Sequence, residues 1–253
     1  MMAATLLLAA AAAPLLAGRA TPPPHIALVL GDDVGWASAG FTGSGAAPTF
    51  TPRLDALARR GVVLGRFYGF HYCSPSRSSL LSGRLPVHVF DGPPTMQLNV
   101  ANPADPDAGQ YGIPVSMATL ATRLAQTHEA HTVGKWDVGH ARPSMVATGR
   151  GFRTSFGYLG GENDYWSAVG CPYSGCCTGG HSKLQGQDVL DFWGTNGPAN
   201  RSLVALDCNG EVSCPAASDF LESQFLARAQ ALIASYAAAA SPAGKRLMLY
   251  YAA

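Results

Sequence analysis

Residues 25–30 form a continuous run of mainly aliphatic side chains between three prolines and Gly31. A short apolar run without polar alternation is typical of a strand that is covered on both faces, as in a parallel sheet. Residues 62–68, 131–133 and 246–251 predict further strands of this kind. A chain with several such strands needs helices to cover the two faces of its sheet.

Helices are predicted between these strands. Residues 51–61 and 74–83 each open with a hydroxyl residue followed by proline and close with glycine, which favours a helix start and a helix end. Ser116 is predicted to cap a helix that runs to about His128, and residues 220–240 predict a long helix. Alternating strands and helices predict an α/β fold with a largely parallel central sheet and helices on both faces.

Composition excludes several classes of protein. Hydrophobic residues make up 47% of the 253 residues and charged residues 13%, which is unlike a disordered chain or a coiled coil. This length is enough for one α/β domain with a substantial core, or for two smaller domains. The formal net charge is +1 and there is no basic run, so no nucleic-acid partner is expected.

The N-terminal residues indicate export. Residues 3–17 are apolar except for Pro14, and small residues follow, so residues 1–20 are predicted to be a cleaved signal peptide. An uncleaved anchor or a misplaced start remains the alternative. The apolar stretch is shorter than the roughly 18 residues of a membrane span, and no stable membrane insertion is expected.

Residues 149–218 are rich in Gly, Ser and Cys and are predicted to form an irregular excursion from the domain. Five of the six cysteines lie between residues 171 and 214, which favours disulfides in an oxidising compartment. A zinc site that includes His181 is the alternative, although the spacing matches no zinc pattern. Asn200 begins an acceptor sequence for N-glycosylation, as expected of a secreted glycoprotein.

Two adjacent carboxylates follow the first predicted strand. In sheets of this type ligands bind beyond the carboxyl ends of the strands, and Asp32 and Asp33 lie at that edge. Adjacent carboxylates repel each other unless a cation compensates them. A hard divalent metal ion with oxygen ligands is therefore the predicted partner.

The segment 73–84 reads CSPSRSSLLSGR and places Cys73 just outside the predicted helix start, where the positive end of the helix dipole stabilises an anion. This segment resembles the type I sulfatase signature C-x-P-S-R-x-x-x-L-x-G-R. The D-D-x-G-W segment at 32–36 and the G-K-W segment at 134–136 resemble the same family. Residues 150–166 resemble the arylsulfatase B branch, and the similarity runs with gaps from about residue 25 to residue 253.

The resemblance implies an alkaline-phosphatase-like α/β fold and a particular chemistry. Cys73 would be converted to formylglycine by the formylglycine-generating enzyme, and the hydrate of that aldehyde would be the nucleophile. Arg77 and Lys135 would be the other catalytic residues. One Ca²⁺ ion would be held by Asp32, Asp33 and the converted Cys73.

The implied function is that of a sulfuric ester hydrolase, an arylsulfatase-type enzyme acting on an aryl or sugar sulfate. The substrate would be a sulfated small molecule or glycan, and the protein would reside in the secretory pathway, in lysosomes or outside the cell. A phosphoester hydrolase of the same superfamily is disfavoured, because such enzymes usually place Thr or Ser at the nucleophile position rather than a cysteine.

Two departures from the family pattern favour an alternative. Asp137 stands where sulfatases carry a histidine, and His140 is a candidate substitute. Residues 21–253 resemble only the N-terminal part of a sulfatase catalytic domain, so the sheet is expected to be incomplete at its C-terminal end. The alternative is a truncated or inactive sulfatase-like protein that binds metal or sulfated glycan without turnover.

Overall fold

The computed structural model describes residues 22–42, 51–89, 112–140, 143–161, 163, 165, 183–184, 187–188, 193–195, 197–198, 220–238 and 244–252. The predicted signal peptide, the five clustered cysteines, His181 and Asn200 lie outside the described residues. Within the described residues, no helix combines the length and the hydropathy that are needed to span a bilayer.

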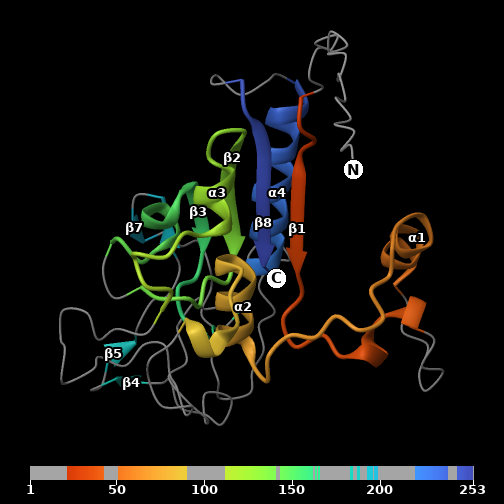
Figure 1. Ribbon diagram of the computed structural model, residues 1–253, viewed down its shortest axis with the longest axis horizontal. Helices are drawn as coiled ribbons and strands as arrows, with labels where there is room; N and C mark the ends of the chain where they lie inside the picture. The colour runs from red at the N-terminus through yellow and green to blue at the C-terminus, as the bar shows by residue number, and fades with distance from the viewer. Residues whose placement is uncertain are drawn as a thin grey trace, which may run out of the picture.

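A six-stranded sheet forms the centre of the structure (Figure 1). Its first four strands are parallel, and two short antiparallel strands extend it at one side, which confirms the predicted largely parallel sheet. In spatial order the strands are β1 (Ile26–Leu30), β8 (Arg246–Ala252), β2 (His128–Gly134), β3 (Phe152–Gly157), β6 (Trp193–Gly194) and β7 (Gly197–Pro198). A separate hairpin joins β4 (Lys183–Leu184) and β5 (Gln187–Asp188).

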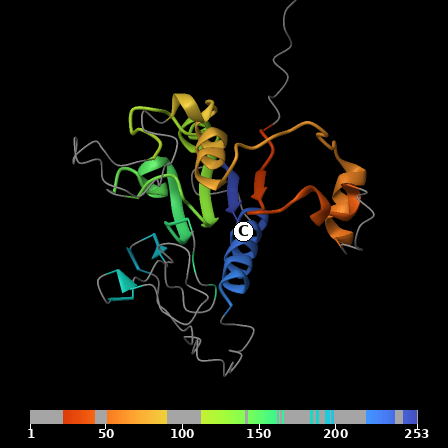
Figure 2. The ribbon, with the colours of Figure 1, turned by 90° about the horizontal axis from the view of Figure 1, so that it is seen from below.

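Helices cover both faces of the sheet, as predicted. α2 (Cys73–Ser82) and α3 (Leu120–Leu124) lie on one face, and α4 (Leu221–Ala238) lies on the other (Figure 2). β8 serves both layers because its side chains alternate: Met248 packs into the core beneath α2, and Leu249 packs into the core beneath α4. Four short 3₁₀ turns complete the described elements: η1 (Trp36–Ser38), η2 (Gly40–Thr42), η3 (Pro86–His88) and η4 (Ala147–Arg150).

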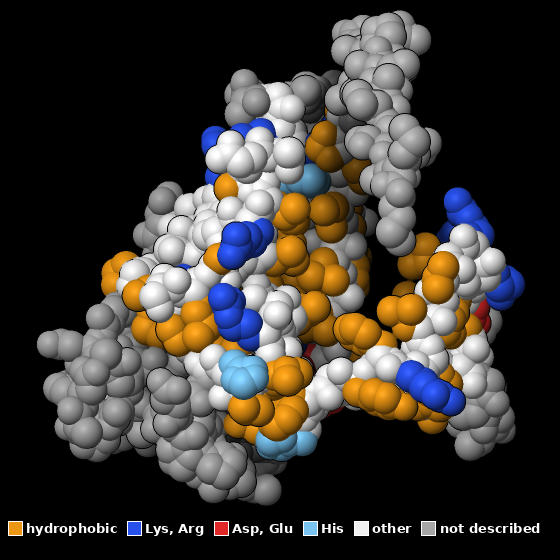
Figure 3. Space-filling model, in the orientation of Figure 1, with side chains coloured by type: hydrophobic (Ala, Val, Ile, Leu, Met, Phe, Trp, Pro, Cys, Tyr) orange, Lys and Arg blue, Asp and Glu red, His pale blue; other side chains and the backbone are white. Residues whose placement is uncertain are grey.

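α1 (Pro52–Arg60) forms where the sequence predicted it, with Thr51 before it and Gly61 after it. The helix stands apart from the sheet and contains no buried residue (Figures 1 and 2). The strand predicted at residues 62–68 is wrong. These residues form an irregular segment in which Val62 is 86% exposed, because no strand of the described residues pairs with them. Apolar side chains of α1 and of residues 62–68 are therefore exposed on the surface (Figure 3).

Other predicted boundaries shift. α3 begins after Thr119, whose hydroxyl accepts a hydrogen bond from the Thr122 amide in a capping box, so Ser116 is not the cap. β2 begins at residue 128 rather than 131. β3 lies within the excursion predicted as irregular. β1 is a parallel strand, but only one face of it is covered: Leu28 packs on the core, and Val29 is 66% exposed.

Candidate active site

Strand register brings two distant segments to one edge of the sheet. β8 lies between β1 and β2, and its Ala252 is opposite both Leu30 of β1 and Gly134 of β2. β1 and β2 therefore end at the same level of the sheet. Asp32 follows the end of β1, and Lys135 follows the end of β2. This edge is formed by the carboxyl ends of parallel strands, where ligands gather in folds of this class.

The turn after β2 depends on a glycine. Gly134 has a φ of +96°, and a Cβ atom added there would collide with the carbonyl oxygen of Ala252. The close approach allows the backbone amide of Lys135 to donate to that same oxygen at 3.0 Å. Gly134 thus allows the chain to bend sharply while the lysine stays against the end of β8.

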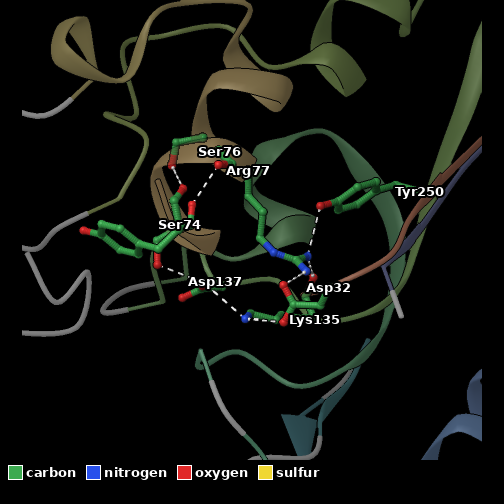
Figure 4. Close-up of polar contacts among 9 residues, drawn as sticks. Asp32, Ser74, Ser76, Arg77, Lys135, Asp137 and Tyr250 are labelled. Carbon is green, nitrogen blue, oxygen red and sulfur yellow. Dashed lines mark hydrogen bonds and ion pairs between the residues drawn. The ribbon is translucent and has the colours of Figure 1, made fainter. Parts of the chain in front are cut away.

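The carboxylate of Asp32 forms ion pairs with two buried cationic side chains (Figure 4). Its Oδ2 lies 2.8 Å from Lys135 Nζ, and its Oδ1 lies 3.2 Å from Arg77 NH2. Both cationic side chains are 1% exposed, whereas that of Asp32 is 22% exposed. Burial by itself raises the pKa of Asp32, but the hydrogen bond and charge of Lys135, with the charge of Arg77, outweigh it and lower the pKa. The carboxylate is therefore held in its charged form.

Arg77 is fixed from two further directions. It lies one turn into α2, and its NH1 donates to the backbone carbonyl of Lys135 at 3.1 Å and to the Tyr250 hydroxyl at 3.3 Å. Tyr250 projects from the middle strand of the three, β8, and is fully buried. The guanidinium consequently spans the gap between α2 and the edge of the sheet.

Asp137 belongs to the same buried cluster. It is 2% exposed, its Oδ2 accepts the Ser74 hydroxyl at 2.9 Å, and the same oxygen lies 3.7 Å from Lys135 Nζ. Burial raises the pKa of Asp137 above its ordinary value, although the charges of Lys135 and Arg77 and the bonds from Ser74 and Cys73 act in the opposite direction.

Cys73 is the first residue of α2, and Tyr72 precedes it as the N-cap. The prediction that Cys73 lies just outside the helix is wrong by one position, because the Ser74 hydroxyl bonds to Asp137 instead of capping the backbone. The Cys73 thiol is free and partly exposed, and the side chain of the next residue, Ser74, bonds to Asp137. The thiol thus remains in the positive field of the helix start.

Asp33 and His140 are placed differently from the buried cluster. Asp33 is exposed, has a φ of +51°, and makes no ion pair with any described residue. Such a backbone conformation is uncommon for a residue other than glycine and is found at functional sites. His140 has a buried Nδ1 atom without a hydrogen-bond partner among the described residues.

The structure thus brings together Asp32, Arg77 and Lys135, with Cys73 at the edge of the same cluster through Asp137. Sequence reasoning missed Ser74 and Tyr250. Ser74 occupies a variable position of the cysteine segment, and Tyr250 lies in an apolar strand. The signal for Tyr250 was its hydroxyl group in a strand that was otherwise predicted to be an apolar part of the core. A buried hydroxyl needs a hydrogen-bond partner.

Comparison with known proteins identifies the family. The Sulfatase family model matches residues 24–204. The chain belongs to the sulfatase family. Among curated sulfatases it is 36% identical to arylsulfatase J of Mus musculus, over 64% of this chain and 25% of that protein. It is 39% identical to N-acetylgalactosamine-6-sulfatase of Mus musculus, over 61% of this chain and 29% of that protein.

The solved structures agree on the sulfatase fold. The crystal structure of Ps i-CgsB superposes with a TM-score of 0.62 at 23% identity, over 91% of this chain and 44% of that one. The PsFucS1 sulfatase from Pseudoalteromonas sp. superposes with a TM-score of 0.62 at 19% identity, over 90% of this chain and 43% of that one. The alkaline-phosphatase-like α/β fold expected from the sequence is therefore confirmed. This sulfatase chain spans about a quarter of the curated relatives quoted above and less than half of these two solved structures.

We expect Asp32→Asn to lower the free energy of unfolding by about 2 kcal/mol, because it leaves Arg77 and Lys135 buried without their shared anion. Asp33→Asn is the matched control, since Asp33 is exposed and makes no ion pair within the described residues; with EGTA present, so that no bound metal contributes, its effect should stay within about 0.5 kcal/mol. Urea unfolding of both variants measures the difference. Equal effects of the two substitutions would contradict the ion cluster.

Proposed function

We propose that this protein hydrolyses sulfate esters and that its nucleophile is the hydrate of a formylglycine formed from Cys73. The observation that carries the proposal is a partly exposed thiol at a helix start, beside a buried cluster with two cations. A helix start and paired cations stabilise the oxyanions that form during transfer of a sulfuryl group. The proposal requires the formylglycine-generating enzyme as a partner during biosynthesis.

The proposed reaction proceeds in two steps. One hydroxyl of the hydrate attacks sulfur, the sulfur–oxygen bond to the alcohol breaks, and the alcohol leaves with a proton. The second hydroxyl then loses its proton, the carbon–oxygen bond to the sulfate breaks, and the aldehyde re-forms. Water restores the hydrate, so the sum is ester plus water giving alcohol and hydrogen sulfate. Lys135 and Arg77 stabilise the negative charge of the transferring group.

The two aspartates that follow β1 are suitable as part of the ligand set of a calcium site. Exposed Asp33 has no cationic partner among the described residues, and it lies beside Asp32, so the two supply carboxylate oxygens of the kind that Ca²⁺ prefers. The described residues contain no group of three acidic, His or Cys ligands, so they supply only part of the six to eight oxygens of a calcium shell.

In the proposed site Asp32, Asp33 and the oxygen of the converted Cys73 would hold the calcium ion; as a free thiol, Cys73 does not form one ligand group with the two aspartates in the described residues. When bound, the ion would act as a Lewis acid that polarises the sulfate oxygens. We expect chelation with EGTA to reduce hydrolysis of 4-nitrophenyl sulfate and added Ca²⁺ to restore it. In Asp33→Asn, restoration should require at least about tenfold more Ca²⁺, since a carboxylate ligand is lost. Full activity in EGTA would contradict the assignment.

The relatives support a sulfated sugar or aryl sulfate as substrate. One relative is named N-acetylgalactosamine-6-sulfatase, and others are named arylsulfatases. A structural neighbour at 20% identity, Ps i-CgsB, was crystallised in complex with k-i-k-neocarrahexaose. We therefore propose a sulfated glycan or small aryl sulfate as the substrate class, encountered in the secretory pathway, in lysosomes or outside the cell.

We expect the peptide that contains Cys73 to be about 18 Da lighter than its unmodified form when the protein is made together with a formylglycine-generating enzyme, because a thiol is replaced by a carbonyl. Mass spectrometry of the digested protein measures the conversion. Cys73→Ala should lower the hydrolysis of 4-nitrophenyl sulfate by at least about 10³-fold.

Ser79→Ala, in the last turns of α2, is the matched control and should retain both conversion and activity. An unconverted thiol together with no turnover would overturn the proposal and would favour the non-catalytic binding protein.

A further inference from the structure

Position 137 is where this chain departs from the sulfatase pattern, and the structure gives its aspartate a specific set of contacts. The Oδ2 atom accepts the Ser74 hydroxyl at 2.9 Å and lies 3.7 Å from Lys135 Nζ (Figure 4). The residue adopts a φ of +53°, and its amide donates to the Leu159 carbonyl at 3.2 Å. The carboxyl group is therefore held in place by its backbone as well as by its partners.

These contacts join two elements that carry proposed catalytic groups. Ser74 immediately follows Cys73 in the first turn of α2, and Lys135 follows the last residue of β2. A single oxygen of Asp137 contacts both. The lysine ammonium in turn lies between two carboxylates, at 2.8 Å from Asp32 and 3.7 Å from Asp137. The position of that ammonium is set by the balance of the two attractions.

We propose that Asp137 is a positioning residue, which ties the cysteine-bearing turn of α2, through Ser74, to the ammonium group of Lys135. This inference rests on the proposed sulfatase function and deepens it. Without the carboxylate, Lys135 would pair with Asp32 alone and its ammonium would move toward β1. Without the Ser74 bond, the first turn of α2 would lose its anchor to the edge of the sheet.

The alternative role for this residue is that of an anion which repels the sulfate. The geometry does not favour that role. Asp137 accepts from Ser74 at its Oδ2 atom, which also faces the ammonium group of Lys135. Its charge is therefore neutralised locally before it can act on a substrate at the surface of the cluster. The two roles make opposite forecasts for the Michaelis constant when the charge is removed.

The test separates the two contacts of Asp137 by substitution. Asp137→Asn keeps an oxygen that accepts from Ser74 and removes the charge that attracts Lys135. Ser74→Ala removes the hydroxyl and leaves the charge, and Asp137→Ala removes both contacts. Ser78→Ala is the matched control, because Ser78 is also buried in α2 but its hydroxyl donates to the Ser74 backbone carbonyl at 2.8 Å.

Steady-state hydrolysis of 4-nitrophenyl sulfate by converted protein is the measurement. We expect Asp137→Asn to raise KM and to lower kcat, each by at least about fivefold, because the displaced Lys135 contacts the sulfate both in the bound substrate and during transfer. Ser74→Ala should lower kcat by at least about fivefold with KM within about twofold, because the nucleophile is displaced. Asp137→Ala should show both changes, and Ser78→Ala neither.

Two results would overturn the inference while the proposed function stands. A fall in KM for Asp137→Asn would mean that the carboxylate repels the substrate directly. Equal losses of kcat in all four variants, with KM unchanged, would mean that the contacts serve only stability, and the thermal midpoints of the variants would then fall in parallel.

A different result identifies failure of the proposed function itself, namely wild-type protein that does not hydrolyse the ester. The inference is then decided on the unconverted thiol, through the rate at which iodoacetamide alkylates Cys73, followed on its peptide by mass spectrometry. The inference is supported if the alkylation rate changes by at least about threefold in Ser74→Ala and Asp137→Ala and stays at the wild-type value in Ser78→Ala. Equal rates in all proteins overturn it.

Discussion

The carboxylate of Asp32 compensates two cations that the fold removes almost completely from water. Arg77 and Lys135 are each 1% exposed, and a buried cation without a partner is strongly destabilising. The three residues come from three separate segments, so the cluster forms only when the end of β1, the first turns of α2 and the end of β2 have met. The rest of the site, including the partly exposed thiol, is arranged around this contact.

The order of the strands makes that meeting dependent on residues far along the chain. β8 is the last described strand in sequence, yet it lies between β1 and β2. Its Ala252 accepts a hydrogen bond from Lys135 after β2, and its Tyr250 accepts one from Arg77 of α2. β1 and β2 do not pair with each other, and β8 joins them by pairing with both. We infer that the ion cluster assembles late in folding, since long-range parallel pairing must precede it.

Much of the site could be predicted from the sequence, because its chemistry is concentrated in short segments. Asp32 at the end of an apolar strand, Arg77 one turn beyond Cys73, and Lys135 after a glycine were each recognisable, and the structure brings them together. The partners of these residues could not be predicted in the same way. Ser74 was interpreted as a helix cap, but Asp137 takes its hydroxyl through a contact 63 positions away in sequence.

The errors in the prediction of the fold from the sequence have a similar cause. The apolar segment 62–68 has the composition of a strand, but a strand also needs a neighbour, and sequence composition does not supply that information. β3 was overlooked because its side chains are only partly covered, whereas β8, covered on both faces, was predicted almost to the residue. Local patterns thus identified the buried strand β8 and the helix α1, which has clear start and end residues, and failed where a tertiary contact decides the structure.

The central claim is that the Asp32–Arg77–Lys135 cluster and the start of α2 together form the site that receives the sulfuryl group. A crystal of the protein grown with selenate tests this most directly, because the selenium atom is located by its anomalous scattering. We expect a single strong peak in contact with Lys135 Nζ and the side chain at position 73. A peak elsewhere, or none at saturating selenate, would contradict the account.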